Sequence, residues 1–574
     1  MTILHSDLIT LPQLIESAGI NTRRTTENDR VSKSSQPPLA TLSLDAMIAL
    51  SQQVSAIATI PFNQFRLDSR QVAVNDVFVL LKSQTPNCQK SRHHLYQAAQ
   101  NAAFILSEID PSPLLEEATV PPHAHLQINE AKRPMNESAT AEPFWSALPC
   151  PMLYVPNIRD FLGDMIQTRL QYQQAVVLPN VIAVTGTNGK TTISQLVAQL
   201  TQLAGMQSAI MGTAGNGRLG ALVQASHTTG DVLAVQQFIH QMGTECAEIL
   251  ALEASSHGLD QQRLQGVPIS VAIYTNLSRD HLDYHSDMAE YAAAKSMLFD
   301  KGHFPTLTHA IINADDDYAS LMMDRAKRSG LIVWTYSLEP HSQATFVATQ
   351  IRPSLQGVEI ELHSEYGDMT LTSPLLGRFN VANLLAAIAA TLALQPVVDG
   401  SLETIGAVVP KLQGAVGRMQ RVPSKTGCFI VDYAHTPDAL SQVLASLSTH
   451  CEGKLWAVFG CGGDRDTGKR PLMAQAGLAG ADHVILTADN PRTESPVAIL
   501  KDMQVGMSAE QYQRTHIEPS RQQAIEYAVT QASPNDIVVI AGKGHETYQE
   551  INGVRHDFDD TVCLRQALEH ADRL

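Results

Sequence analysis

One segment, residues 181–205, constrains the fold of this chain more than any other. A short apolar run, VIAVTG (181–186), leads into the turn TNGK and then into TTISQLVAQLTQLAG (191–205), where apolar residues recur at helical spacing. A buried strand, a glycine-containing turn and a helix in this order are typical of a parallel sheet with crossover helices. The segment therefore predicts an α/β fold.

Similar apolar runs, each ending in a polar or glycine-rich loop, occur on both sides of this segment. On the N-terminal side we expect a strand, a helix and a strand at 76–81, 93–102 and 103–108. We expect further strands at 247–253, 270–277, 428–434, 455–460, 483–488 and 536–542, and a long apolar helix at 377–394. The 574 residues suffice for roughly three or four domains. We predict three, at 1–178 (with an insertion at about 110–150), 179–412 and 413–574.

Charge and cysteine content exclude several classes of partner and location. Asp and Glu number 57 against 40 Lys and Arg, so the net charge is -17 and the chain repels nucleic acid and anionic lipid. The seven cysteines form no Cys-x-x-Cys pair, which suits a reducing cytosol. No apolar run approaches the roughly 18 residues of a membrane helix. We expect a cytoplasmic protein with no nucleic-acid partner and no membrane insertion.

The turn after the first strand has the composition of a phosphate-binding loop: Gly186, Thr187, Asn188, Gly189, Lys190, Thr191 and Thr192. Glycines let successive backbone N–H groups face one anion, and the helix N-terminus adds partial positive charge. Lys190 can reach the terminal phosphates of a nucleotide, and the Thr191 hydroxyl can ligate Mg²⁺. The common pattern has a glycine where Val184 stands, so the match is to a shorter variant. The alternative is a glycine-rich turn with a solvated lysine.

Two further segments carry candidate metal ligands. Glu253 ends an apolar strand, where a carboxylate beside a phosphate loop is a natural Mg²⁺ ligand, although it could also be a helix N-terminal acid. His281 and His285 have the i,i+4 spacing of a zinc pair, but no cysteine lies nearby, which favours His281 as a Mg²⁺ ligand and a structural His285. Lys295, on a helix of small residues, is by itself typical of an exposed helix lysine.

Four polar loops follow the C-terminal strands, at 432–437, 460–466, 489–492 and 542–546. In open parallel sheets, ligands bind beyond the carboxyl ends of the strands, so these loops should share one crevice. The glycine-rich loop does not fit the dinucleotide pattern. Arg465, Arg492 and Glu546 suit a zwitterionic ligand, because guanidinium groups bind carboxylates and a carboxylate binds an ammonium group.

The segments TGTNGKTT, EASSHGL, TNLSRDHLDYH, EYAAAK, GRFNVANLLAA, GRMQ, DYAHTPDAL, GCGGDRD, DNPRTE and GKGHE occur in this order and resemble the Mur ligases. The resemblance runs from LDSR (67–70) to the end of the chain, and DNPR resembles the branch that adds meso-diaminopimelate. It implies a UDP-sugar-binding N-terminal domain, a central P-loop ATPase-like domain with a parallel sheet, and a C-terminal Rossmann-like domain that brings the amino acid.

The resemblance also implies the reaction and its small-molecule partners. ATP would phosphorylate the D-Glu γ-carboxylate of UDP-MurNAc-L-Ala-D-Glu, and the amine of meso-diaminopimelate would displace phosphate from this acyl phosphate. We expect a monomer in which the C-terminal domain closes over the central one to exclude water, with a hinge near 395–415.

Site roles follow by the same resemblance. Catalysis would use Lys190, Glu253, His281 and Lys295. Besides the loop from Gly186 to Thr192, ATP would contact Asn380, Arg418, Asp432 and His435. Mg²⁺ would be held by Thr191, Glu253, His281 and Lys295, the last as its N6-carboxy (carbamylated) form. UDP-MurNAc-dipeptide would contact Leu67, Ser69, Thr228, Thr229, Ser255, Gln261 and Arg263. Diaminopimelate would contact Arg465, Asp489, Asn490, Pro491, Arg492, Gly542 and Glu546.

Two other classes of function stay open at this stage. One is a sister amide ligase, such as a lysine-adding Mur ligase or a folylpolyglutamate synthetase. Arg492 favours diaminopimelate over lysine, because its guanidinium would face the side-chain ammonium group of lysine. The other is a non-catalytic nucleotide-binding regulator, which would not release phosphate in a manner that requires both co-substrates.

Overall fold

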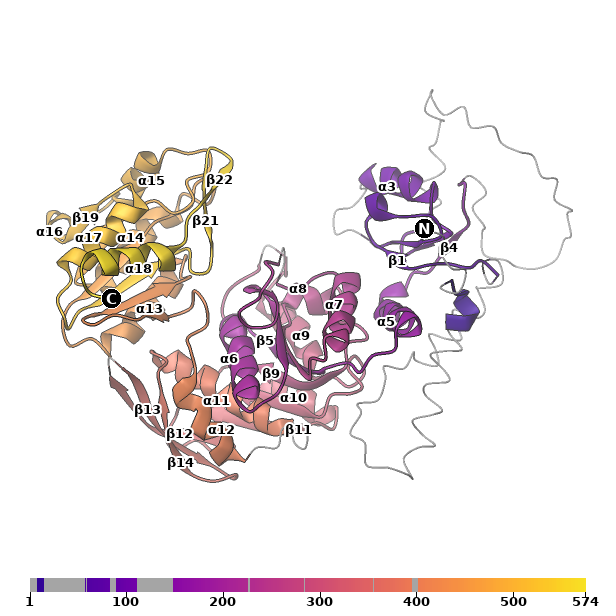
Figure 1. Cartoon of the computed structure of the whole chain (residues 1–574), viewed down its shortest axis with the longest axis horizontal. Coiled ribbons are helices and arrows are strands. Elements are labelled where there is room, and N and C mark those ends of the chain that lie inside the picture. The colour runs from indigo at the N-terminus through magenta and orange to yellow at the C-terminus, as the bar shows by residue number, and fades with distance from the viewer. Residues whose placement is uncertain are drawn as a thin grey trace, which may run out of the picture.

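Three large sheets, arranged along the chain, form the framework of the molecule (Figure 1); the first is parallel, and the other two are mixed with mostly parallel pairs in their interior. The computed structural model describes residues 8–14, 57, 59–82, 89–110, 148–225, 228–282, 284–354, 356–394 and 401–574. The polar stretch at 111–147 and the first part of the expected hinge, 395–400, lie outside these residues. No helix in the described ranges is long and apolar enough to cross a membrane.

The N-terminal sheet has four parallel strands in sequence order: β1 (Phe65–Arg66), β2 (Val77–Leu80), β3 (Phe104–Ser107) and β4 (Met152–Tyr154). The helix α3 (Gln89–Ala99) connects β2 to β3, as the apolar spacing predicted. α5 (Leu162–Gln173) follows and leads into the central sheet. Its first turn packs against the central part of the chain, where the Gln265 amide oxygen accepts hydrogen bonds from the backbone N–H groups of Gly163 (2.6 Å) and Asp164 (3.1 Å).

The central sheet has ten strands in the order β14-β13-β12-β11-β10-β9-β5-β8-β6-β7. Its strands are β5 (Asn180–Thr185), β6 (Ser208–Gly212), β7 (Gly215–Gly217), β8 (Ile249–Glu253), β9 (Ile269–Tyr274), β10 (His309–Asn313), β11 (Ile332–Ser337), β12 (Phe346–Ser354), β13 (Gly357–Ser364) and β14 (Met369–Ser373). From β12 to β6 in this order, neighbouring strands pair in parallel. At the edge next to β6, β7 is antiparallel. The antiparallel pairs formed by β12, β13 and β14 were not predicted from the sequence.

Helices cover both faces of the central sheet. They are α6 (Lys190–Leu203), α7 (Val232–Thr244), α8 (Ser256–Asp260), α9 (Met288–Ser296), α10 (Ala319–Arg328), α11 (Arg378–Ala393) and α12 (Leu402–Val408). Successive side chains of a strand point to opposite faces, so Ile182 and Val184 pack with α6 and α11, whereas Val181 and Ala183 pack with α7. Burial on both faces explains why these strands are continuously apolar.

The C-terminal sheet has the order β15-β16-β20-β17-β18-β19, with an antiparallel β15 at its edge. Its strands are β15 (Gln420–Val422), β16 (Cys428–Asp432), β17 (Leu455–Phe459), β18 (His483–Leu486), β19 (Thr515–Ile517) and β20 (Ile537–Ala541). Its helices are α13 (Pro437–Ser448), α14 (Lys469–Gly480), α15 (Pro496–Met503), α16 (Ala509–Gln513), α17 (Arg521–Gln531) and α18 (Asp560–His570). A hairpin of β21 (Tyr548–Ile551) and β22 (Val554–Asp557) follows β20.

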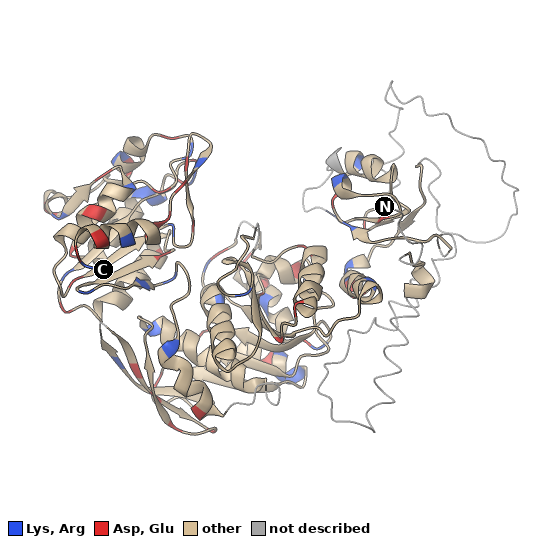
Figure 2. Cartoon of the chain, viewed as in Figure 1, with Lys and Arg blue, Asp and Glu red and all other residues tan. Residues whose placement is uncertain are grey.

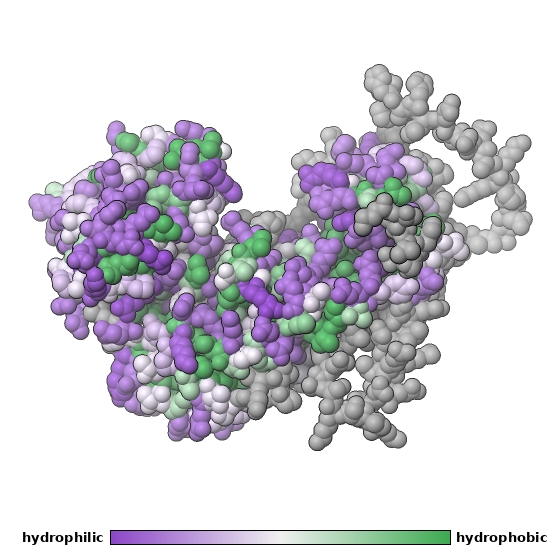
Figure 3. All heavy atoms as spheres, viewed as in Figure 1, coloured by the Kyte–Doolittle hydropathy of each residue, from purple (hydrophilic) through white to green (hydrophobic). Residues whose placement is uncertain are grey.

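The three sheets enclose a concave face. Figure 3 shows the surface hollowed above the central part, between the N-terminal and C-terminal ends of the molecule. Charged residues of both signs are spread over all three parts of the described chain, and no single basic face stands out in this view (Figure 2). The polar loops singled out in the sequence directly follow the carboxyl ends of strands. These strands are β5, β8 and β9 in the central sheet and β17, β18 and β20 in the C-terminal sheet.

Candidate active site

The loop after β5 has the tight curl that its two glycines permit. Gly186 and Gly189 have φ values of 149° and 90°, which favour glycine. A Cβ on Gly186 would lie 1.8 Å from the Thr275 hydroxyl oxygen, so no other residue fits there. The Lys190 ammonium group folds back over the loop and donates to the carbonyl oxygens of Gly186 and Thr187, each at 2.9 Å. The loop therefore presents a cation and the N-terminus of α6 at one point.

A cavity of about 440 Å³ opens above this loop. Its wall combines residues of the central sheet with residues of the C-terminal sheet: Thr187 to Thr192, Thr213, Thr228, Glu253, Thr275 to Ser278, Asn313, Asp316, Tyr336, Phe379, Ala382, Asn383, Arg418, Asp432, Ala434, Ala439, Gln442 and Val443. Burial lowers the pKa of Lys190, the Glu253 carboxylate opposes that shift, and Arg418 adds to it. Such a cavity, with a phosphate loop on its floor, has the size and polarity of a nucleotide site.

Three of the residues expected near ATP, Gly186, Asn380 and His435, are not on the wall of this cavity. Asn380 is buried and donates to the Leu376 carbonyl at 2.8 Å, while its own side-chain oxygen accepts from Asn383 at 3.1 Å. Asn383, one helical turn further along α11, lines the cavity instead. His435 is exposed, with Nδ1 2.9 Å from the Tyr433 carbonyl oxygen. The sequence alone did not single out Asn383, although it lies within the GRFNVANLLAA segment.

Arg418 and Asp432 bring the C-terminal sheet to the nucleotide cavity. The Asp432 carboxylate accepts from the backbone N–H groups of Met419 and Ala434, both at 2.7 Å. Burial raises the pKa of Asp432, and the Arg418 guanidinium opposes this. That guanidinium also lies 4.5 Å from the centre of the Tyr433 ring. The arrangement fixes a second cation, Arg418, on the wall of the cavity that Lys190 also lines.

Glu253 ends β8 and is 1% exposed. Its carboxylate accepts from the backbone N–H of Thr213 at 2.9 Å and from the Thr213 hydroxyl at 3.2 Å. Gly212 is the last residue of the neighbouring strand β6. A Cβ on it would lie 2.1 Å from a Glu253 carboxylate oxygen, so glycine leaves room there for the Glu253 side chain. Thr213, which orients the carboxylate, was missed in the sequence, where its only signal is its position at the carboxyl end of a strand.

Lys295 is a fully buried residue of the site, contrary to what its helix position suggests alone. Its side chain is 1% exposed, and its amine donates to the Gly186 carbonyl oxygen at 2.9 Å. It also lies 4.6 Å from the centre of the Tyr291 ring. Burial lowers the pKa of Lys295 well below its ordinary value, and the nearby cation of Lys190 lowers it further. The amine is thus poised to be uncharged, which makes it a nucleophile.

A second cavity, of about 390 Å³, lies beside the first and shares Lys190, Thr213 and Thr228 with it. The other residues that line it are Ala225, Thr229, Ser255, Ser256, His257, Arg263, His281 and Lys295. The first cavity holds the phosphate loop, and the second holds most of the residues expected to bind the muramoyl peptide. The two sites therefore meet at Lys190.

His281 belongs to a cluster of aromatic rings at the edge of the second cavity. Its ring centre lies 5.0 Å from that of His257 and 6.0 Å from that of Tyr291. His285 is 1% exposed and packs against Tyr291 at 5.2 Å, as expected of a structural histidine. His281 has φ 54°, an uncommon value for a residue other than glycine. Within the described ranges, no three His, Cys, Asp or Glu side chains form a ready-made metal cluster.

The residues expected to hold the muramoyl peptide form a connected network. The Thr229 hydroxyl donates to the Glu253 carbonyl oxygen at 2.8 Å and accepts from the Ser255 backbone N–H at 3.1 Å. Arg263 donates to the Thr229 carbonyl at 2.9 Å and, through Nη2, to the Gln261 side-chain oxygen at 2.7 Å. Thr228 joins the network by accepting from the Thr213 hydroxyl at 3.0 Å. The Glu253 carboxylate and the residues expected to bind the peptide therefore belong to one hydrogen-bond network.

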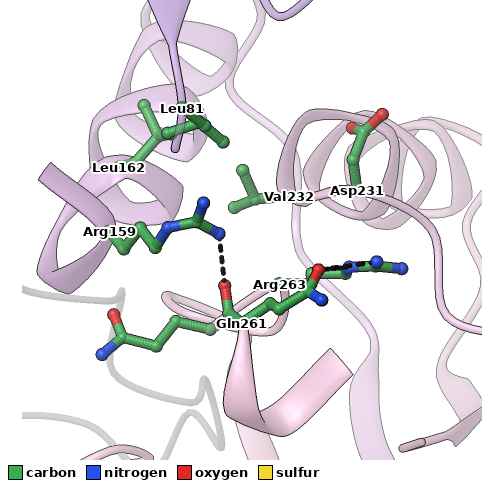
Figure 4. A pocket seen from close by; sticks show the side chains of 8 residues that line it. Leu81, Arg159, Leu162, Asp231, Val232, Gln261 and Arg263 are labelled. Carbon is green, nitrogen blue, oxygen red and sulfur yellow. Dashed lines mark hydrogen bonds between the residues drawn. The ribbon is translucent and has the colours of Figure 1, made fainter. Parts of the chain in front are cut away.

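A third cavity, of about 270 Å³, lies between the N-terminal and central parts (Figure 4). Leu81, Leu162 and Val232 form its apolar side. On the other side, the Arg159 guanidinium donates to the Gln261 carbonyl oxygen at 3.1 Å, as Figure 4 shows. Arg159 also donates to the Lys82 carbonyl oxygen at 3.0 Å, so it links Gln261 to the segment that follows β2.

Leu67 and Ser69 line a fourth cavity, of about 390 Å³, on the N-terminal sheet. The Ser69 hydroxyl donates to the Gln97 side-chain oxygen at 2.8 Å and lies 2.9 Å from His94 Nδ1. The Arg70 guanidinium holds the pKa of the Asp68 carboxyl down to about 2. The cavity is polar on one side and apolar at β2, which suits a nucleobase.

The loops at 489–492 and 542–546 meet over the C-terminal sheet. The Glu546 carboxylate accepts from the Asn490 amide at 2.8 Å and from the Lys543 ammonium at 3.0 Å. Lys543 is 0% exposed and also donates to the Asn490 side-chain oxygen at 3.2 Å. The Asp489 carboxylate approaches so closely that a Cβ on Gly542 would lie 2.5 Å from it. Lys543 was missed, although it stands within the GKGHE segment.

Arg492, on the loop after β18, contacts the loop that follows β17. It has φ 51°, and its guanidinium donates to the Gly463 carbonyl at 2.6 Å and lies 3.9 Å from the Glu550 carboxylate. A Cβ on Gly463 would collide with the Pro491 carbonyl at 2.0 Å, so the two loops are in close contact. Arg465 is exposed on the same loop as Gly463. The strand order β20-β17-β18 brings these three loops together, as predicted.

A parallel sheet that presents a lysine-bearing phosphate loop and a strand-end carboxylate to one cavity defines the class of P-loop nucleotide-binding proteins. Residues 184–391 match the family model described as Mur ligase middle domain, and residues 417–544 match that described as Mur ligase, glutamate ligase domain. The chain belongs to the Mur ligase family.

Two similar proteins of known name are both called UDP-N-acetylmuramoyl-L-alanyl-D-glutamate--2,6-diaminopimelate ligase. The relative from Pseudomonas aeruginosa is 47% identical over 390 residues, which cover 68% of this chain and 78% of the relative. The relative from Ectopseudomonas mendocina is 41% identical over 510 residues, covering 88% and 94%. A solved structure of that name superposes with a TM-score of 0.66 at 42% identity and covers 90% of this chain and 97% of that one.

Proposed function

We propose that this chain is the ATP-dependent ligase that adds meso-diaminopimelate to UDP-MurNAc-L-Ala-D-Glu in the synthesis of peptidoglycan precursors. Relatives that cover most of the chain carry this activity in their name. The observation that carries the proposal is the meeting of two cavities at Lys190, Thr213 and Thr228. ATP in the first and the dipeptide in the second would bring a γ-phosphate to a carboxylate.

The first step is the transfer of the γ-phosphoryl group to the D-Glu γ-carboxylate. The phosphate loop and Lys190 would hold the triphosphate, and Arg418 would approach it from the C-terminal sheet. These cations act where negative charge accumulates, which is the main requirement of phosphoryl transfer. Arg263 and Thr229 would position the peptide, because they already belong to the hydrogen-bond network that orients Glu253.

The side chains around the phosphate loop fit Mg²⁺. Thr191 and Glu253 offer a hydroxyl and a carboxylate to the first cavity, and both oxygens are hard ligands of the kind that Mg²⁺ prefers. Mg²⁺ at nucleotide sites usually takes one or two carboxylates from the protein and the rest from phosphates and water. His281 and Lys295 line the second cavity and would serve a second ion there. Bound Mg²⁺ would screen the two anions that must meet.

Lys295 suits carbamylation. An uncharged amine can attack CO₂, forming a N–C bond while the nitrogen releases a proton, and burial favours the uncharged form here. The product is a carboxylate on a cavity wall that otherwise holds His281 and the cation Lys190. It would add the oxygen ligand that a second Mg²⁺ requires.

The second step is the attack of the diaminopimelate amine on the acyl phosphate. Glu546 would bind an ammonium group and Arg492 a carboxylate of the distal end, which leaves the other amine to react. These loops lie outside both catalytic cavities. We propose that the C-terminal sheet closes over the central one, which would also protect the acyl phosphate from water.

We retain the division into domains at 1–178, 179–412 and 413–574 as a proposal, because each range holds one of the three large sheets. The hydrogen bonds between Gln199 and Gln413, at 2.8 and 3.1 Å, tie the start of the third range to α6. A cytoplasmic location and a monomeric state stay predictions from the sequence.

The test of this proposal is turnover by the purified full chain. UDP-MurNAc-L-Ala-D-Glu, ATP and Mg²⁺ are supplied with meso-diaminopimelate or L-lysine in parallel, and the peptide product and released phosphate are measured. We expect product and phosphate with diaminopimelate. Equal product with lysine would favour the lysine-adding alternative, and phosphate release from ATP alone would favour a simple ATPase.

A further inference from the structure

A buried ion pair beneath the C-terminal sheet joins Arg521 and Asp560. Both side chains are 0% exposed. The guanidinium donates through Nε and Nη2 to the two oxygens of the Asp560 carboxylate, each at 2.7 Å. Arg521 begins α17 and Asp560 begins α18, so the pair also links the N-termini of two helices.

The same guanidinium also binds the ends of two strands. It donates to the Ala541 carbonyl at 2.9 Å and to the Ala488 carbonyl at 3.3 Å. Ala541 is the last residue of β20, and Ala488 lies two residues beyond the end of β18. In the sheet order β20-β17-β18, these two strands are not neighbours. Arg521 therefore connects two strand ends across β17.

Each of these carbonyls immediately precedes a loop assigned to the amino acid. Asp489 follows Ala488, and Gly542 follows Ala541. The loops touch at this point, because a Cβ on Gly542 would lie 2.5 Å from the Asp489 carboxylate and 3.9 Å from the Arg521 guanidinium. Further along, the two loops are joined again by the hydrogen bond from the Asn490 amide to the Glu546 carboxylate. Arg521 thus sets the spacing at the base of both loops.

Stability alone does not account for this arrangement. A cation in the first turn of a helix opposes the helix dipole, and a buried ion pair loses in desolvation much of what it gains in attraction. An apolar pair of similar volume is often at least as stable as a buried ion pair, but it could not donate to the Ala488 and Ala541 carbonyl oxygens. Only a guanidinium can bind a carboxylate with one edge and reach two separate carbonyls with the rest.

We infer that Arg521 is a positioning residue for the amino-acid substrate, acting through the loops 489–492 and 542–546. This inference rests on the proposed function. A displacement of the loops on the ångström scale would misplace Asn490 and Glu546, and hence the reacting amine. The ATP cavity contains neither loop, so nucleotide binding would be unaffected.

The experiment compares Arg521→Lys with Arg514→Lys in the full chain. Arg514 also bridges two backbone carbonyls, those of Ala481 (2.9 Å) and Leu478 (2.7 Å), but at the opposite end of β18. The Michaelis constants for meso-diaminopimelate, ATP and UDP-MurNAc-dipeptide are measured together with the melting temperature. Asp560→Asn, which keeps the guanidinium, is the second variant in case Arg521→Lys does not fold.

We expect Arg521→Lys to raise KM for meso-diaminopimelate about tenfold to a hundredfold, with KM for ATP and for the dipeptide essentially unchanged. Asp560→Asn should shift the same constant in the same direction. Arg514→Lys should lower the melting temperature without a selective change in any KM. An equal rise in all three constants, or no rise for diaminopimelate in the folded variants, would overturn the inference. Failure of the unsubstituted chain to use diaminopimelate would instead refute the proposed function.

Discussion

The buried amine of Lys295 donates a 2.9 Å hydrogen bond to the carbonyl oxygen of Gly186, the first residue of the phosphate loop. A lysine on a short helix of small residues is thereby buried against the phosphate loop. Its burial and its nearness to Lys190 depress its pKa, and both effects favour a reactive, uncharged amine.

Replacement of Lys295 should separate activity from stability. We expect Lys295→Met to abolish ligation, and Lys295→Ala to recover part of its activity with a short carboxylic acid. The pKa of Lys295 is lower in the folded protein than in the unfolded chain. At pH values between these two pKa values, the unfolded chain therefore binds more protons than the folded protein. The stability of the unsubstituted chain should therefore rise with pH in that interval relative to Lys295→Met.

The measurement is chemical denaturation at several pH values in CO₂-free buffer, with exposed Lys327→Met as the control. Activity in degassed buffer should fall and return with bicarbonate. Full activity of Lys295→Met would contradict the role of the amine.

Glu253→Gln should weaken metal-dependent turnover without disturbing the fold. The amide is isosteric, and its one oxygen can still accept from the Thr213 backbone N–H, while its NH₂ group can donate to the Thr213 hydroxyl. It lacks the charge that favours Mg²⁺. We expect kcat to fall at least about a hundredfold and the Mg²⁺ concentration for half-maximal rate to rise. Glu248, exposed just before the other end of β8, provides the matched control Glu248→Gln. Unchanged Mg²⁺ dependence would remove Glu253 from the metal site.

Arg492→Ala should affect the amino acid far more than the nucleotide. A hydrogen bond to a charged group contributes about 1.5–3 kcal/mol, so KM for meso-diaminopimelate should rise about tenfold to a hundredfold. KM for ATP should not change, and use of L-lysine should not fall, because lysine lacks the second carboxylate. Arg555→Ala, on the exposed adjoining hairpin, is the control. An equal loss for ATP and diaminopimelate would contradict the assignment.

Asp164 should make stability depend on pH. Burial raises its pKa to about 6, against a hydrogen bond from Gln265 that lowers it. Since the folded pKa exceeds the unfolded value of 3.8, the native state binds the extra proton between the two, and stability falls as pH rises through about 6.

Asp164→Asn mimics the protonated form at every pH, so near neutrality it should be more stable than the unsubstituted chain by about 3 kcal/mol. The difference should vanish below the unfolded pKa. Denaturation at acidic and neutral pH measures it, with exposed Asp160→Asn as the control. A constant difference across the pH range would show that burial of this carboxyl does not govern stability.

The sequence predicted the local elements of the sites well. The β5 strand, the curl at Gly186 and the α6 helix follow from apolar spacing and from glycine, which are local properties. The placement of polar loops after strands also predicted that the loops 489–492 and 542–546 meet, because the carboxyl ends of parallel strands share one edge. The antiparallel strands β12 to β14 escaped prediction, since their alternating, partly exposed pattern gives a weaker signal.

Only the tertiary structure decided the environments of single side chains. Lys295 lies 109 residues from Gly186 in sequence, and nothing in the spacing of its own helix reveals its burial. Likewise, Thr213, Lys543 and Arg521 are held by partners that lie 40, 53 and 39 residues away in sequence. Hydrophobic periodicity and turn chemistry are encoded within a few neighbouring residues, so the sequence alone determined the phosphate loop and the strand and helix on either side of it. Burial, pKa and hydrogen-bond partners depend on which distant segments pack together, and the fold alone determines that.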